Sequence, residues 1–240
     1  MSDSTLPAGS IGVIQSPFDE LFGIPRQSGL AEQASGYLIP TPPWDEPQAW
    51  AGIEAFSHLW LIWSFDGKKP MSTQGRKSVR PPRLGGNERV GVFASRAPVR
   101  PNPIGLSLVR LIAVHEKQPG QANSGVYLQL AGLDLRDQTP VWDVKPYIPY
   151  ADCPEQARAD WAAHPPLRVP VVFASSVQDH PALNAVFKAL LEDTLSLDPT
   201  PAYHQDTNRR YGVCVQGWDV QFYRRQDRIE VIGLIAPQTE

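Results

Sequence analysis

Residues 54–65 read EAFSHLWLIWSF, a nearly continuous run of apolar and aromatic side chains. Such a run is typical of a strand that is buried on both faces or that belongs to a barrel. Other segments that are apolar or alternate in polarity, and that contain β-branched residues, lie at residues 10–16, 89–94, 105–115, 125–133 and 141–145. Because turn residues bound these segments and no helical segment separates them, the pattern predicts an antiparallel barrel or sandwich. Residues 17–50, rich in Pro, Gly and polar residues, are expected to be mostly loop.

The composition changes after this β-rich region. Residues 153–167 are mainly Ala, Pro and polar residues, which predicts a connector with a short helical turn near residues 155–163. Beyond the connector we expect strands at residues 169–174, 211–215, 220–223 and 228–235. We expect one helix between them, opened by Asp179, His180 and Pro181. Its buried face is predicted to contain Leu183, Val186, Phe187, Leu190 and Leu191.

These segments predict a mainly β protein with three parts. We expect residues 1–152 to form a β-domain and residues 168–240 to form a small α+β C-terminal domain, with residues 153–167 as the connector between them. Over 240 residues the chain is 42% hydrophobic and 20% charged, which excludes disorder, while 25 Pro and 18 Gly exclude a helix bundle.

Several classes of protein are excluded by what the sequence lacks. Its longest apolar runs fall far short of the roughly 20 residues that span a bilayer, and MSDSTLPAGS at the start has no signal-peptide pattern. Cys153 and Cys214 lie far apart without CxxC spacing, and the five histidines show no metal-binding spacing, so we expect no disulfide and no metal. His58 is expected to be a core histidine. We expect a cytoplasmic enzyme or binding protein with no membrane partner.

The charge is distributed unevenly. The net charge is −3, yet the stretch from Lys68 to Arg110 has ten basic residues and one acid, Glu88, leaving 12 basic and 24 acidic residues elsewhere. An acidic protein that concentrates arginine in one stretch is suited to bind a phosphate-bearing partner there. The alternative is a solvated charged loop.

Four short segments combine polar residues with Pro and Gly. They are FGIPRQSGL at 22–30, VRPPRLGGNE at 79–88, FASRAPVRPNPIGLSL at 93–108 and LDLRDQTP at 133–140. In the third, prolines 98, 101 and 103 stiffen the backbone, so that Arg96, Arg100 and Asn102 project from a rigid loop. The alternative is that the prolines only protect an exposed edge from pairing. The chain has neither GxGxxG nor GxxxxGK[ST], the motifs of Rossmann and P-loop nucleotide sites.

Five segments of the first 150 residues read FGIPRQ, AFSHLWLI, VRPPRLGGN, GVFASRAPVRPNPIGLSLV and LDLRDQTPVWDVKPY. Together they strongly resemble the TrmO family, also called TsaA-like or YaeB-like. LDPTPAYH and RRYGVCV resemble the smaller C-terminal domain of its two-domain bacterial members. The resemblance implies a single-sheet antiparallel β-barrel N-terminal domain and an S-adenosylmethionine-dependent tRNA methyltransferase. The implied substrate is N6 of adenosine 37, already bearing threonylcarbamoyl, in threonine tRNA, and the implied assembly is a homodimer.

The resemblance also implies which residues bind the methyl donor. They are Pro25, Arg26, Gln27, Phe65, Asp66, Arg96, Leu106, Asp134, Leu135, Arg136 and Asp137. Two positions depart from the family motif, because Asp66 stands where the family has His and Gln138 stands where it has Gly.

These residue types suit the implied reaction. A cationic sulfonium is favoured by carboxylates such as Asp66, Asp134 or Asp137 and by aromatic faces such as Trp60 or Phe65. Arg26 or Arg96 would face the methionyl carboxylate. An anticodon loop presents phosphates and splayed bases, which arginines can bind, and the candidates are Arg80, Arg83, Arg89 and Arg100. The C-terminal domain could add a second surface for stacking and phosphate contacts, made of Arg209, Arg210 and Tyr211.

Two residues are candidates for catalysis. Asp137 can take the N6 proton, or it can be a turn-capping aspartate. Asn102 can orient N6, or it can hold its own loop. Two other functions stay open from the sequence: a noncatalytic RNA-binding barrel that uses only the basic stretch, and a methyltransferase acting on a small molecule.

Overall fold

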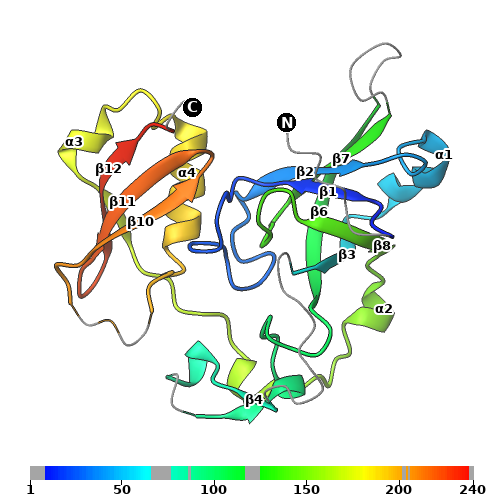
Figure 1. The fold of residues 1–240 in the computed structure, drawn as a ribbon, viewed down its shortest axis with the longest axis horizontal. Helices are drawn as coiled ribbons and strands as arrows, with labels where there is room; N and C mark the ends of the chain where they lie inside the picture. The colour runs from blue at the N-terminus through cyan, green and yellow to red at the C-terminus, as the bar shows by residue number, and fades with distance from the viewer. Residues whose placement is uncertain are drawn as a thin grey trace.

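The computed structural model describes residues 9–65, 77–85, 88–116, 125–201, 204 and 206–237. Figure 1 shows a barrel on one side, a smaller sheet with a helix on the other, and a small two-stranded sheet below them.

Within these described ranges, six strands close a barrel in the order β1-β2-β7-β6-β3-β8, with antiparallel pairing throughout. The strands are β1 (Gly12–Gln15), β2 (Ser35–Pro40), β3 (His58–Ser64), β6 (Ile104–Glu116), β7 (Val126–Ala131) and β8 (Pro140–Pro146). The predicted antiparallel barrel is confirmed.

The aromatic run at residues 54–65 is a barrel strand rather than a strand buried on both faces. Along β3, Leu59, Leu61 and Trp63 point into the barrel and are buried, while the alternate residues are only half-buried. Trp60 therefore lies on the outer face, where its ring is 6.2 Å from that of Tyr147. His58, expected in the core, is half-buried on the same outer face and hydrogen-bonds Ser57.

Of two expectations for this region, one is confirmed and one is wrong. As expected, residues 17–50 are mostly loop, although Ser35–Pro40 form β2 and Pro47–Trp50 form the short helix α1 within them. Residues 89–94 do not form a barrel strand. They split into β5 (Val90–Gly91), which pairs with β4 (Ser78–Val79), and a 3₁₀ turn, Val92–Ala94.

The C-terminal sheet has the order β10-β11-β12-β9, with β9 parallel to β12. Its strands are β9 (Val171–Phe173), β10 (Arg210–Val215), β11 (Trp218–Arg224) and β12 (Ile229–Ile235). Helix α4 (Ala185–Leu195) packs Phe187, Leu190, Leu191 and Leu195 into the same core as the sheet.

The predicted start of this helix is wrong. Residues Ser175–Gln178 form a separate short helix, α3, and α4 begins after Asn184, whose side chain accepts a hydrogen bond of 2.9 Å from the amide of Phe187. Asparagine is a favoured N-cap, so it outcompetes the predicted start at Asp179–Pro181. Val186, predicted to be in the core, is 76% exposed.

The region between the two sheets contains short elements. They are α2 (Pro149–Asp152) and the 3₁₀ turns Ile53–Ala55, Pro82–Leu84 and Asp160–Ala162, the last within the predicted helical turn of the connector. In the part of the chain that the structure describes, no helix has both the length and the apolar character to cross a membrane.

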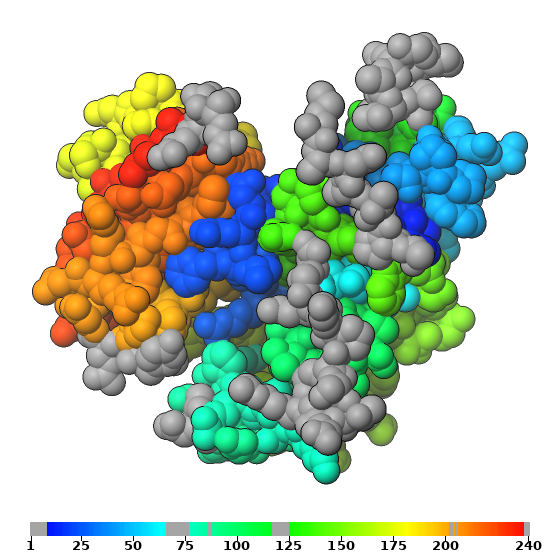
Figure 2. All heavy atoms as spheres, in the orientation of Figure 1, coloured from blue at the N-terminus to red at the C-terminus, as the bar shows by residue number. Residues whose placement is uncertain are grey.

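The segment after β1 leaves the barrel and enters the core of the C-terminal sheet. Phe18, Ala31 and Ala34 are buried there together with Val213 and Phe222. Figure 2 shows this early part of the chain lying between the barrel and the C-terminal sheet. The two units therefore share one core segment.

Candidate functional site

The described polar contacts inside the barrel mouth centre on Asp134. This residue follows β7 after a turn in which Gly132 has φ +77°, a backbone conformation that favours glycine. The Ser107 hydroxyl on β6 donates to the Asp134 carboxylate at 2.6 Å, and the Trp63 indole on β3 donates to Ser107 Oγ at 2.9 Å. Ser107 of β6, itself held by Trp63 of β3, thus fixes the carboxylate that follows β7.

Removal from water raises the pKa of Asp134 to about 6 from an ordinary value of 3.8. Hydrogen bonds from Ser107 and from the backbone, and attraction to Arg96, act in the opposite direction but only partly offset the burial. Asp134 is therefore a carboxylate that ionises just below neutral pH.

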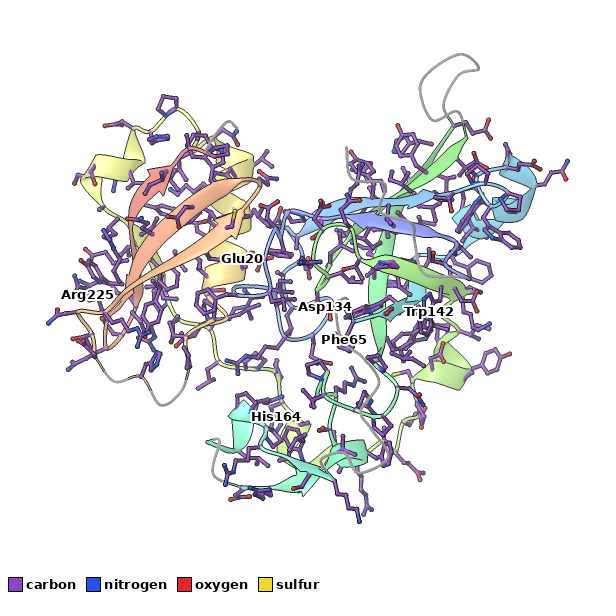
Figure 3. The ribbon with its side chains drawn as sticks, viewed as in Figure 1. Glu20, Phe65, Asp134, Trp142, His164 and Arg225 are labelled. Carbon is purple, nitrogen blue, oxygen red and sulfur yellow. The ribbon has the colours of Figure 1, made fainter. Side chains whose placement is uncertain are left out.

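Aromatic rings lie beside this carboxylate. The Trp63 and Phe65 ring centroids are 4.4 Å apart. In the β3–β6 register Trp63 lies opposite Gly105, and a Cβ atom on Gly105 would come within 2.1 Å of the indole. Glycine at 105 is therefore required for the indole to lie against the strand. Figure 3 shows Asp134 and Phe65 close together at the end of the barrel that faces the C-terminal sheet.

Arg96, in the Pro-rich loop, lies near enough to Asp134 to attract its carboxylate. Its guanidinium donates to the side-chain oxygen of Gln27, which lies in the FGIPRQ segment. In the same loop, the Arg100 guanidinium donates to the backbone carbonyl of Ser95 at 3.0 Å, so Arg100 holds the loop conformation. Arg96 is exposed and Arg100 half-buried.

The structure brings together part of the predicted donor-binding set. Gln27, Phe65, Arg96 and Asp134 converge through the contacts above, and Pro25 and Arg26 precede Gln27 in the same loop. Leu106 is 51% exposed on the outer face of β6, and Leu135 is buried in the barrel core. Arg136 and Asp137 follow in the turn toward β8. Asp66 lies outside the described residues.

The two predicted catalytic residues contact the backbone of their surroundings. The Asp137 carboxylate accepts from the amide of Ser16 at 3.0 Å and from the side chain of Gln138 at 3.2 Å. It therefore ties the turn to the end of β1 instead of capping its own turn. Asn102 is exposed in the Pro-rich loop, and its carbonyl accepts from the amide of Ile104 at 2.8 Å.

The predicted RNA-binding arginines occupy different environments. Arg80, Arg83 and Arg89 are exposed in the segment that joins β4 to β5, where Arg83 donates to the carbonyl of His164 in the connector and Arg89 to Ser78. Arg210 is exposed at the start of β10. Tyr211 is only 9% exposed, because its ring stacks between Phe22 and Phe222, so it offers no free face for a base.

Residues 13–153 match the family model of the tRNA-methyltransferase O N-terminal domain. The chain belongs to the tRNA-methyltransferase O family. Residues 166–237 match the TrmO C-terminal domain. An Escherichia coli protein named tRNA (adenine(37)-N6)-methyltransferase is 40% identical over 235 residues, which cover 93% of this chain and 95% of that relative.

The chain is also similar to a protein and to a solved structure from Pseudomonas aeruginosa. A protein named putative S-adenosylmethionine-dependent methyltransferase RcsF is 43% identical over 231 residues, covering 93% of this chain and 95% of that protein. The crystal structure of TrmO from this organism is 37% identical and superimposes with a TM-score of 0.73, covering 97% of this chain and 99% of that one. The TrmO resemblance and the barrel fold are therefore confirmed.

Sequence reasoning missed three residues of the contact network around Asp134: Ser28, Trp63 and Ser107. Ser107 alternates with Gly105 and Val109 on the inward face of β6, and a buried hydroxyl at such a position needs a partner. This polar residue in an apolar inward row was the available signal. Ser28 Oγ accepts from the amide of Leu108 at 2.9 Å, a contact between distant segments that no local pattern indicates.

Proposed function

We propose that this chain is an S-adenosylmethionine-dependent methyltransferase acting on N6 of adenosine 37 in tRNA. The observation that carries the proposal is the half-buried Asp134 carboxylate, held by Ser107, beside the Trp63–Phe65 pair and within the field of Arg96. The names of the relatives and the family models support the same reaction.

The residues present fit the chemistry of the donor. When bound, S-adenosylmethionine supplies an electrophilic methyl group on a cationic sulfonium. Asp134, ionised at neutral pH, would stabilise that cation by electrostatic attraction. The face of the Phe65 ring, which is uncharged, would contact the cation as well. Arg96, held by Gln27, would bind the methionyl carboxylate through charge-assisted hydrogen bonds.

The rest of the catalysis is positioning. Holding the nucleophilic nitrogen about 3 Å from the methyl carbon, in line with the bond to sulfur, requires no covalent enzyme intermediate. The stiff loop of Arg96 and Arg100 borders the site and would place the RNA over it. Asp137 is already bonded to Ser16, so we assign it to the turn and Asp134 to the donor.

The finer substrate is proposed on the resemblance of the motifs: threonylcarbamoyladenosine 37 of threonine tRNA. As the bond from N6 to the methyl carbon forms, the bond from that carbon to sulfur breaks and neutral S-adenosylhomocysteine leaves. A carbamoyl group makes N6 more acidic than a plain amine, so its proton can pass to solvent water. We also propose a cytoplasmic homodimer. Outward-facing Ile104, Leu106 and Ile112 on β6, each more than 40% exposed, support a covered barrel face.

One mixing experiment tests the function against its alternatives. The purified protein is incubated with methyl-labelled S-adenosylmethionine and threonine tRNA, with and without threonylcarbamoyl. We expect label in the modified RNA only. Donor binding without transfer to either RNA would contradict the proposal and favour a small-molecule methyltransferase, and RNA binding without donor binding would favour a noncatalytic RNA-binding barrel.

A further inference from the structure

We propose that the C-terminal unit positions the donor loop, residues 22–28, and that Phe22, Gly23 and Val213 are positioning residues for methyl-donor binding. This inference rests on the proposed function, because it takes the donor to bind beside Gln27 and Asp134. It concerns residues that lie outside the barrel and touch neither reacting atom.

One end of the donor loop is fixed to the barrel. Ser28 Oγ accepts from the amide of Leu108 on β6, and the amide of Gly29 donates to the carbonyl of Gly132 at 2.9 Å. Gly132 precedes the Asp134 turn by two residues. The position of the donor loop therefore determines how Gln27 faces Arg96 and how Ser28 faces Asp134.

The other end is fixed to the C-terminal sheet. Phe22 stacks on Tyr211 of β10 with centroids 6.4 Å apart and an interplanar angle of 19°. Gly23 has φ +93°, and a Cβ atom on it would lie 2.1 Å from Cγ2 of Val213, a fully buried residue of β10. The backbone of the donor loop thus lies directly against β10, and only glycine permits this approach.

The segment before the donor loop is held by the same strand pair. The amide of Gln216 donates to the carbonyl of Pro17 at 2.7 Å, and the amide of Gly217 donates to the Asp19 carboxylate at 2.8 Å. The amide of Cys214 donates to Glu20 at 2.9 Å. Because the β10–β11 turn binds the chain at these points, the donor loop cannot shift along the sheet without breaking them.

A cavity of about 170 Å³ lies on another side of the donor loop, lined by residues 21–26 together with Thr194, Leu197 and Pro199 at the end of α4. The loop is therefore tightly packed where it meets β10 but not where it meets α4. A side chain added at Gly23 can displace the loop into this space, which moves Gln27 while the fold persists.

The test is Gly23→Ala, measured by calorimetric titration with S-adenosylmethionine. We expect the dissociation constant to rise about tenfold, which corresponds to ~1.4 kcal/mol. Gly52→Ala is the matched control, because Gly52 has φ +86° with nothing within 4 Å of its added Cβ and lies outside the donor loop. It reproduces the backbone strain without the clash, so we expect its dissociation constant to stay within about twofold of wild type.

A compensating variant separates positioning from general destabilisation. In Gly23→Ala/Val213→Ala the removed methyl groups make room for the new Cβ, so we expect donor affinity to recover most of its loss. In steady-state assays, Gly23→Ala should raise KM for the donor and leave KM for tRNA unchanged. If Gly23→Ala does not fold, Phe22→Leu decides the question, because losing the stacked ring should weaken donor binding in the same direction.

The outcomes are distinct. If the wild type binds no donor, the proposed function fails and the positioning role fails with it. A wild type that binds, together with a folded Gly23→Ala of unchanged donor affinity and reduced melting temperature, would overturn the positioning role alone. Failure of the double variant to recover affinity would overturn it as well.

Discussion

Asp134 illustrates how one residue can combine a structural and a chemical requirement. Its carboxyl is held by Ser107 and shielded from water, so the folded chain favours the protonated form up to about pH 6. Because the pKa is raised by folding, the stability contributed by protonated Asp134 is present at low pH and is lost as the pH rises from about 4 to about 6.

The same titration should control recognition of the sulfonium. We expect affinity for S-adenosylmethionine to increase between about pH 5 and about pH 7, because Asp134 becomes anionic there. The neutral thioether S-adenosylhomocysteine should show a smaller dependence. Calorimetric titrations across this range test the idea, and Asp134→Asn should bind S-adenosylmethionine weakly at every pH. Parallel pH profiles for the two ligands in the wild type would contradict it.

Gln138 has a backbone conformation that is unfavourable for a residue with a side chain. It has φ +60°, in the left-handed region that favours glycine, which is the residue that the TrmO resemblance implies at this position. Gln138→Gly should raise the free energy of unfolding by about 1 kcal/mol without changing donor affinity, since it removes backbone strain. Chemical denaturation provides the measurement. Gln129→Gly, on the extended strand β7, is the control and should be destabilising; a destabilised Gln138→Gly would show that the side chain is needed.

At the scale of elements, most strands are predictable from the sequence, whereas their partners are not. The alternation in β3 and β6 is local, so it can be read from the chain. Strand β2 was missed because its six residues are surrounded by Pro and Gly and are stabilised as a strand by pairing with β1 and β7. The Ser107–Asp134 contact joins residues 27 positions apart, so only the closed barrel reveals it.

The small β4–β5 sheet places two arginines of the basic stretch next to each other. Val79 pairs with Val90 in antiparallel register. Arg80 directly follows β4 and Arg89 directly precedes β5, so the two arginines lie at the same end of this strand pair. Like charges in adjacent strands repel, and a bound phosphate would relieve that repulsion. Arg80 and Arg89 are therefore our candidates for tRNA backbone contacts, while Lys68, Lys69 and Arg76 of this stretch lie outside the described residues.

Arg80→Ala/Arg89→Ala should weaken tRNA binding and reduce the slope of log affinity against log salt by about one for each lost phosphate contact, with donor affinity unchanged. Filter binding across a salt series measures the slope. Lys188→Ala/Arg228→Ala removes the same charge from exposed positions of the C-terminal unit and should alter the slope less. An unchanged slope in the first variant, or loss of donor binding, would assign this sheet to another role.

Across the whole molecule, the shared segment after β1 couples the barrel to the C-terminal unit. Phe18 is fully buried in the core of the C-terminal sheet, although it follows β1 by only three residues. Domain boundaries taken from composition put this segment entirely in the N-terminal domain. Local composition contains no information on which core a loop residue enters.

Phe18→Ala should lower the free energy of unfolding by about 3–5 kcal/mol, because it leaves a cavity between the two units. Calorimetric unfolding should show a reduced melting temperature. Phe93→Ala, at a residue 78% exposed, should change stability by less than about 0.5 kcal/mol. Equal stability of the two variants would mean that the shared segment does not couple the units.

The most direct test of the proposed function is to identify the methylated nucleoside. Threonine tRNA bearing threonylcarbamoyladenosine at position 37 is incubated with the protein and S-adenosylmethionine, digested to nucleosides and examined by mass spectrometry. We predict one added methyl group on N6 of that nucleoside, strongly reduced in Asp134→Asn and absent when position 37 is guanosine. A methyl group on any other nucleoside, or none at donor concentrations that saturate binding, would contradict the proposed function.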